Sequence, residues 1–253
     1  MRKSCSECGH HWFWRLSDGR SKCRRCGHRQ SFRSAWDASR LSESAKRRLL
    51  EFFVLGVPAY RLRFRSPASP EATERFFRLC RRVLALAEGC QQPFDGRIEC
   101  DEALFGGVRK GKRGWGAAGK VLVFGILKRN GRARVFAVQG RGRDELLPLI
   151  QEHTTPGSLY YTDDWQAYAS LAVRGGHVVV TKRRGVPKGR DHINGIEGFW
   201  SYAKHWLYQY RGVPKKFFHL YLAETSFRFN HRGEDMFPLI YALMKRTYIS
   251  RIR

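Results

Sequence analysis

The spacing of apolar residues divides the 253-residue chain into three regions. Residues 1–36 show no regular apolar repeat and are rich in cysteine. Residues 40–92 carry apolar side chains at helical spacing, and residues 95–253 begin with alternating or continuous apolar runs, which are typical of strands. The pattern therefore predicts a small N-terminal module, a helical region and a larger domain with a sheet.

The middle region is expected to begin and end with helices. The first covers 42–53 and stops before Gly56 and Pro58, after which a second, short helix should follow. Ser69 is a good N-cap and Pro70 suits the first helical position, so a longer helix is expected to start there. Its arginines favour a helix-turn-helix that binds DNA. A helical linker with a solvated basic face is the alternative.

The larger domain is expected to alternate strands and helices. Its predicted strands cover 97–105, 121–127, 134–138, 158–162 and 177–181, and its helices cover 145–153, a short stretch near 165 and a long stretch from 194. The order βββαβαβα predicts an α/β domain in which helices flank a mixed sheet.

Four of the seven cysteines form two CxxC pairs close to the N-terminus. Cys5 and Cys8 are separated by fourteen residues from Cys23 and Cys26. Each pair can bind one side of a tetrahedral ion, and a glycine follows each pair, which permits a tight turn. In a reducing compartment this pattern indicates metal binding rather than disulfides. We therefore predict a structural zinc ribbon with four thiolate ligands.

Aromatic residues surround the cysteine pairs. Trp12, Phe13, Trp14 and Phe32 can either form the small core of the ribbon or stack on nucleic-acid bases. We expect the core.

The charge of the chain indicates a polyanionic partner. Lysine and arginine number 48 against 22 acidic residues, which gives a formal charge of +26, and aromatic residues are interspersed among them. No apolar run approaches the roughly 18 residues that a membrane helix needs. The first residues also lack the apolar stretch of a signal peptide. We expect a cytoplasmic protein that binds nucleic acid and no membrane.

Acidic residues stand at positions where elements of the larger domain can converge. Asp101 lies in the first predicted strand, Asp163 and Asp164 end the fourth, and Glu197 falls in the first turns of the last helix. Carboxylate oxygens are the ligands that Mg²⁺ prefers. The acids therefore predict a metal site. The alternative to a metal site is that Asp101 is an ordinary acid at a strand edge and that Glu197 is only a favourable charge at a helix N-terminus. Each residue considered alone fits this alternative as well.

Three segments resemble the catalytic blocks of small bacterial insertion-sequence transposases with an N-terminal zinc ribbon. They are Ile98–Gly107, Tyr161–Tyr168 and His192–Trp200, and the resemblance covers nearly the whole chain. It implies an RNase H-like DDE domain over 95–253 that uses Mg²⁺ or Mn²⁺ to transfer the 3′ ends of the element into target DNA. By position, it makes Asp101 and Asp163 the catalytic aspartates and Glu197 the closing glutamate.

Further residues around these blocks are expected to assist. Lys204 lies two helical turns beyond Glu197 and should contact DNA. Asn194, one turn before Glu197, can orient a water or serve as a further ligand. His192 can act as a local acid or base, or cap the helix. Of the adjacent aspartates, the family block favours Asp163 over Asp164.

A glycine-rich basic loop follows the first predicted strand. Arg109, Lys110, Lys112 and Arg113 should lie against DNA phosphates next to Asp101. A second basic run, residues 182–190, precedes the last block and is expected to contact DNA or to form a mobile loop.

Our leading hypothesis is a transposase that binds the terminal inverted repeats of an insertion sequence and cleaves and rejoins DNA strands, with a homodimer or larger assembly on DNA. A structure-specific nuclease of the same fold is the first alternative, and a zinc-ribbon regulator that binds DNA without cutting it is the second. The regulator is disfavoured because carboxylates beside DNA repel phosphates.

Overall fold

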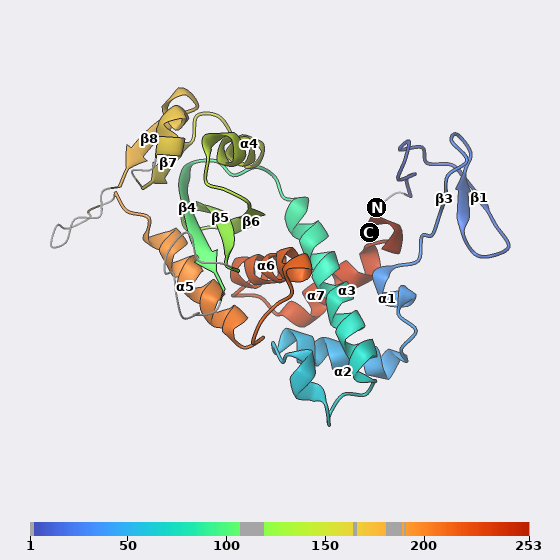
Figure 1. The fold of residues 1–253 in the computed structure, drawn as a ribbon. Helices are drawn as coiled ribbons and strands as arrows, with labels where there is room; N and C mark the ends of the chain where they lie inside the picture. Colours follow the sequence, from blue (N-terminus) through green and yellow to red (C-terminus); the bar gives the residue numbers. More distant parts are fainter. Residues whose placement is uncertain (1–2, 107–118, 164–165, 181–188, 190, 253) are drawn as a thin grey trace. The chain divides into compact units, whose positions relative to one another are not determined.

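The chain folds into two compact units. The computed structural model describes residues 3–106, 119–163, 166–180, 189 and 191–252. One unit combines Met1–Ala87 with Gly233–Arg253, and the other is Glu88–Arg232 (Figure 1). The basic residues Arg109, Lys110, Lys112 and Arg113, residues 182–188 and 190 of the second basic run, and Asp164 lie outside the described residues.

The first unit consists of a small antiparallel sheet followed by helices. Its elements are β1 (Phe13–Arg15), β2 (Ser21–Cys23), β3 (Arg29–Gln30), α1 (Ala35–Ala38), α2 (Glu43–Val54), the 3-10 helix η1 (Ala59–Leu62), α3 (Pro70–Gly89), α7 (Met236–Arg246) and the 3-10 helix η3 (Ile249–Arg251). The helix starts predicted near Ser42 and at Pro70 are confirmed, because the hydroxyls of Ser42 and Ser69 accept bonds from the amides of Ala45 and Ala72.

Trp36 is the centre of the helical part of this unit. Its fully buried ring lies edge-on to Phe76 of α3 at 5.9 Å and to Tyr241 of α7 at 4.8 Å. The last helix therefore packs with the N-terminal unit, whereas the sequence analysis placed it with the larger domain. Arg81 of α3, one of the arginines on which the helix-turn-helix prediction relied, is also buried and lies over the Phe53 ring.

The aromatic residues of the ribbon divide into an inner and an outer pair. Phe13 packs edge-on to Phe32 at 4.8 Å, as expected of a core. Trp12 and Trp14 are 67% and 56% exposed, so the expectation that all four form the core is wrong for the two tryptophans. Strand alternation is the reason, since neighbouring residues of β1 point to opposite faces.

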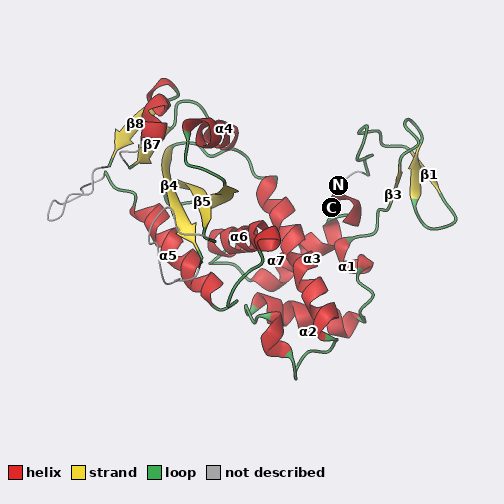
Figure 2. Cartoon of the chain, viewed as in Figure 1, coloured by secondary structure: helices red, strands yellow, loops and turns green. Residues whose placement is uncertain are grey.

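The second unit is built on a five-stranded mixed sheet in the order β6-β5-β4-β7-β8 (Figure 2). Its elements are β4 (Arg97–Phe105), β5 (Val121–Lys128), β6 (Ala133–Val138), α4 (Arg143–His153), β7 (Leu159–Thr162), the 3-10 helix η2 (Gln166–Val173), β8 (Gly176–Val179), α5 (Asn194–Tyr208) and α6 (Lys215–Asn230). β4, β5 and β6 are antiparallel neighbours, and β7 and β8 run parallel to β4. The predicted α/β fold, an RNase H-like mixed sheet with flanking helices, is confirmed.

Helices cover both faces of this sheet. On one face α5 and α6 bury a core that includes Ala103, Ile196 and Phe199. On the other face α4 and η2 bury a core that includes Cys100 and Tyr168. Odd-numbered residues of β4 therefore face α5 and even-numbered residues face α4, which determines where its acidic side chains point.

Glu88 is a buried acid in this unit, remote from the acids of β4 in sequence. Its carboxylate accepts a hydrogen bond from Asn230 at 3.0 Å. Burial raises its pKa to about 7, and the hydrogen bond from Asn230 and the charge of Arg134 oppose this rise only in part. Because the folded state then binds more protons than the unfolded state between pH 6 and 8, ionisation of Glu88 lowers stability as the pH rises.

We expect Glu88→Gln to reduce this pH dependence. Between pH 8 and pH 6 the wild type should gain about 1 kcal/mol of unfolding free energy that the variant does not gain. Chemical unfolding of both proteins at the two pH values measures the difference. An equal gain in both proteins would show that Glu88 is already protonated at pH 8 or stays ionised at pH 6.

Candidate active site

Three carboxylates meet where the two central strands diverge. β7 pairs with β4 only from Arg97 to Glu99, so Asp101 and Glu102 lie beyond the last paired residue of β4. Asp163 directly follows β7. Although Asp101 and Glu102 belong to opposite faces of β4, one oxygen from each lies within 4.8 Å of the others and of an Asp163 oxygen. Asp101 and Asp163 therefore come together as the sequence analysis expected.

Asp101 is oriented by a tryptophan of α5. The Trp200 indole Nε1 donates a 3.0 Å hydrogen bond to Asp101 Oδ2. The indole reaches the sheet because Gly125, the cross-strand partner of Asp101, has no side chain. A β-carbon on Gly125 would lie 2.6 Å from Trp200 Cζ2 and 2.9 Å from Ile196 Cδ1. This close approach fixes α5 against the strand that carries Asp101.

Gly125→Ala should therefore disturb the packing of α5. We expect a loss of about 1–3 kcal/mol in unfolding free energy, as is usual for overpacking. The control is Gly89→Ala, where an added β-carbon meets nothing within 4 Å. Denaturant unfolding of the two variants measures the effect, and equal stability would show that Trp200 does not depend on the missing side chain.

Glu102 is the member of the cluster that the sequence analysis did not single out. Its side chain is 1% exposed, and Oε2 lies 3.8 Å from an Arg141 nitrogen, which is also 3.9 Å from Asp163 Oδ2. Burial raises the pKa of Glu102 to about 7, the charge of Arg141 and the nearby Tyr168 hydroxyl lower it, and the charges of Asp163 and Asp101 raise it further. One signal in the sequence could have revealed Glu102. It is an acid at an even-numbered position of β4, where the other even-numbered residues of the strand are apolar.

Glu99 anchors the beginning of α5. This buried carboxylate accepts a 2.8 Å hydrogen bond from the Ile196 amide and pairs with Arg129 Nε at 2.7 Å. A β-carbon on Gly195 would lie 2.8 Å from Glu99 Oε2, so the helix can approach only with glycine there. A negative charge at a helix N-terminus is favourable. Glu99 thus fixes the position of the first turns of α5, which carry Glu197.

Glu197 lies in the first turn of α5, one turn before Trp200. It is half-buried and is not among the three acids whose oxygens lie within 4.8 Å of one another. Lys204 is exposed on the same side of the helix, with Nζ 6.0 Å from the Phe105 ring. Both side chains therefore lie along the helix that contacts Asp101.

The two assisting residues proposed before α5 have different surroundings. His192 Nδ1 lies 3.8 Å from Glu99 Oε1, and its carbonyl accepts a hydrogen bond from Arg129. Asn194 is exposed at the first position of the helix, and its backbone N–H donates a hydrogen bond to His192 Nδ1 at 3.3 Å. His192 thus belongs to the network that anchors α5.

The acid cluster has the donor set of a hard cation site. Its described ligands are carboxylate oxygens, and two of the three side chains are half-buried, which leaves access for water and substrate oxygens. Mg²⁺ prefers such ligands and retains several waters. Arg141 also lies between Glu102 and Asp163. Its positive charge therefore compensates part of the negative charge of the cluster.

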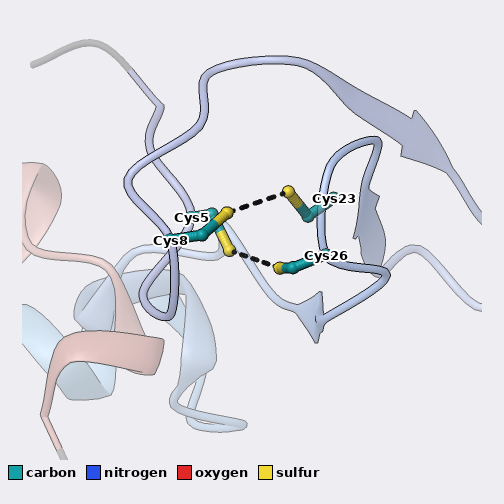
Figure 3. Close-up of side chains that lie close together, drawn as sticks. All are labelled: Cys5, Cys8, Cys23 and Cys26. Carbon is teal, nitrogen blue, oxygen red and sulfur yellow. Dashed lines mark hydrogen bonds between the residues drawn. The ribbon is translucent and has the colours of Figure 1, made fainter.

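The four N-terminal cysteines form a second candidate metal centre (Figure 3). Cys5 Sγ lies 3.5 Å from Cys26 Sγ, and Cys8 Sγ lies 3.6 Å from Cys23 Sγ. All four sulfurs lie within 4.8 Å of one another. Tetrahedral zinc with bonds of about 2.3 Å separates its sulfurs by about 3.8 Å. The cluster therefore fits a four-thiolate zinc site.

Backbone amides prepare one of these thiols for metal binding. Burial raises the pKa of the Cys23 thiol, but hydrogen bonds from the backbone of Cys26 and Arg25 and from Cys8 outweigh it and lower the pKa. At Cys26 the backbone hydrogen bond from His28, which lowers the pKa, is outweighed by burial and by the neighbouring thiols, so the pKa of Cys26 is raised. A thiolate is the form that binds metal.

Comparison with known proteins supports a common origin for the acid-bearing unit. Residues 93–230, more than half of the chain, match the profile of the ISXO2-like transposase domain. An "Uncharacterized transposase-like protein" of Haemophilus influenzae is 39% identical over 87 residues, which cover 34% of this chain and 71% of that protein. Within the described part of the chain, no helix is both long and apolar enough to cross a membrane.

Proposed function

The chain belongs to the ISXO2-like transposase family, and on this basis we propose that it binds the terminal inverted repeats of an insertion sequence and catalyses metal-dependent strand cleavage and strand transfer. The observation that carries the proposal is the meeting of Asp101, within β4, and Asp163, directly after β7. A chain with a formal charge of +26 has little other reason to bring acids together.

In the proposed mechanism, Asp101, Asp163 and Glu197 hold Mg²⁺ or Mn²⁺. When bound, two such ions stabilise the attacking and leaving oxygens of an in-line displacement at phosphorus. Trp200 holds the Asp101 carboxylate by its 3.0 Å hydrogen bond, and Glu99 holds the start of the helix that carries Glu197. These contacts preorganise the ligands, which is how a site avoids reorganisation during the reaction.

DNA contacts in this proposal come from basic residues around the acids. Lys204 reaches phosphates beside the reacting strand from the exposed side of α5. Arg109, Lys110, Lys112 and Arg113 contact phosphates near Asp101, since they follow β4 closely in the sequence. Asn194 orients a water or adds an oxygen ligand at the other end of the site.

We assign the recognition of the element's ends to the N-terminal regions, the zinc ribbon of residues 1–36 and the helical region of residues 40–92. The catalytic DDE domain, predicted over 95–253, lies in the acid-bearing unit and ends at Arg232, since α7 packs with the N-terminal unit. Cys5, Cys8, Cys23 and Cys26 hold Zn²⁺, which stabilises the ribbon and has no open position for chemistry. Because transposition joins two ends of one element, the active complex contains at least two copies of the chain.

A strand-transfer assay tests this function. Purified protein is incubated with a pre-cleaved DNA end that carries the flanking repeat and with a plasmid target, with Mg²⁺ and with no divalent metal added. Joining that requires the metal would support a transposase. Cleavage without joining would favour a nuclease of the same fold, and binding alone would contradict the proposed chemistry.

A further inference from the structure

One face of the zinc ribbon gathers aromatic and cationic side chains. In the antiparallel sheet Trp14 is paired with Lys22, and Lys22 is paired with Arg29. The Arg24 amide donates to the Trp12 carbonyl at 3.0 Å, which continues the same ladder. Paired residues of antiparallel strands point to the same face. Trp12, Trp14, Lys22, Arg24 and Arg29 therefore form one surface, the ribbon's outer face.

The outer face is exposed over its whole extent, whereas the opposite face is partly covered. All five of its side chains are exposed, with Trp12 at 67% and Trp14 at 56%. On the opposite face Cys23 and Gln30 are buried. Large exposed aromatic rings lose the stabilisation that burial would give them, so two on one small sheet indicate a binding surface.

The cations of the outer face determine which partner it suits. Arg24 stacks its guanidinium 4.0 Å from the centre of the Trp14 ring, and Lys22 and Arg29 lie along the next two strands. The turn of the β1–β2 hairpin carries an acid, Asp18, but it is paired with Arg20 at 2.6 Å and so does not neutralise these cations. A second copy of the same face would meet three like charges, so the surface suits an anionic partner.

We propose that the ribbon's outer face binds unpaired bases of DNA, with Trp12 and Trp14 stacking on successive bases and the three cations contacting the phosphates between them. Base faces are available to an indole ring only when the bases are unpaired or unstacked, because a duplex hides them in its own stack. Aromatic rings combined with cations are the usual means of binding single strands. The inference rests on the proposed function only in taking DNA as the partner.

The test is equilibrium binding of the full chain to a short fluorescein-labelled oligothymidine and to a blunt duplex of the same length. No Mg²⁺ is added, so the result does not depend on catalysis. Trp12→Ala and Trp14→Ala should each weaken oligothymidine binding about tenfold, with duplex binding little changed. Trp14→Phe, which keeps an aromatic ring, should retain most of the affinity.

Two controls keep the result interpretable. Zinc content equal to that of the wild type shows that a variant still holds a folded ribbon. Phe64→Ala removes another aromatic ring of the same unit, one that is 86% exposed, and should leave oligothymidine binding unchanged.

Three results would overturn the inference: no binding of oligothymidine by the wild type, unchanged binding by the zinc-loaded tryptophan variants, or equal weakening for single strand and duplex. The last result would assign the outer face to duplex DNA. Failure of the strand-transfer assay alone would leave this binding result intact, so the two proposals can fail separately.

Discussion

Glu197→Gln should abolish DNA cleavage and joining while leaving binding to the element's ends nearly intact. The substitution keeps the size of the side chain and removes its charge. Loss of a carboxylate ligand removes several kcal/mol of transition-state stabilisation, which lowers the rate of joining by about a thousandfold or more. Strand transfer and DNA binding by the same preparation provide the measurement.

Glu152→Gln is the matched control. Glu152 is a glutamate of the same unit, on α4, with a side chain that is 74% exposed. Its amide variant should join DNA at the rate of the wild type. If Glu197→Gln joins DNA as well as this control does, Glu197 is not a ligand of the reacting metals and the closing acid must be sought elsewhere, with buried Glu102 as the first candidate.

Cys23→Ser should release zinc and unfold the ribbon. The variant removes one of four thiolates whose sulfurs lie within 4.8 Å of one another. In small zinc modules the free energy of metal binding, about 10–16 kcal/mol, is also the folding free energy, so the ribbon cannot remain folded without it. Zinc analysis of the purified protein and protease sensitivity of the first residues measure the two effects.

Cys90→Ser serves as the control for this experiment, since Cys90 is an exposed cysteine outside the cluster. It should retain one zinc ion per chain. A Cys23→Ser protein that also retained a full equivalent of zinc would contradict the four-thiolate site. The replacement ligand would then be sought among His10, His11 and His28, which lie next to the cysteine pairs in the sequence.

Local patterns in the sequence were sufficient to predict most helices and strands. Strand β4 has the predicted bounds, and the helix that carries Glu197 begins at Asn194 as expected. Both predictions are correct because the buried side of a regular helix or strand produces apolar residues at a regular spacing in the sequence. The convergence of Asp101 and Asp163 was also expected, because one lies in the first predicted strand and the other ends the fourth, and neighbouring strands can bring such positions together.

Other features depend on distances that no local pattern records. Glu102 joins the cluster only because β7 stops pairing with β4 at Glu99. Arg141 reaches the acids from the segment before α4, where a single arginine in a basic chain has no distinguishing mark. The same holds for Gly125, whose importance comes from the position of a tryptophan 75 residues later.

The division of the chain also affects the order in which it can fold during synthesis. The unit Glu88–Arg232 is continuous, whereas the N-terminal unit is completed by α7, which covers Trp36. A domain usually folds as it leaves the ribosome, the N-terminal one first. Here the first 87 residues must wait for α7 before their central tryptophan is fully covered, so the acid-bearing unit can be complete while the N-terminal unit is still partly open.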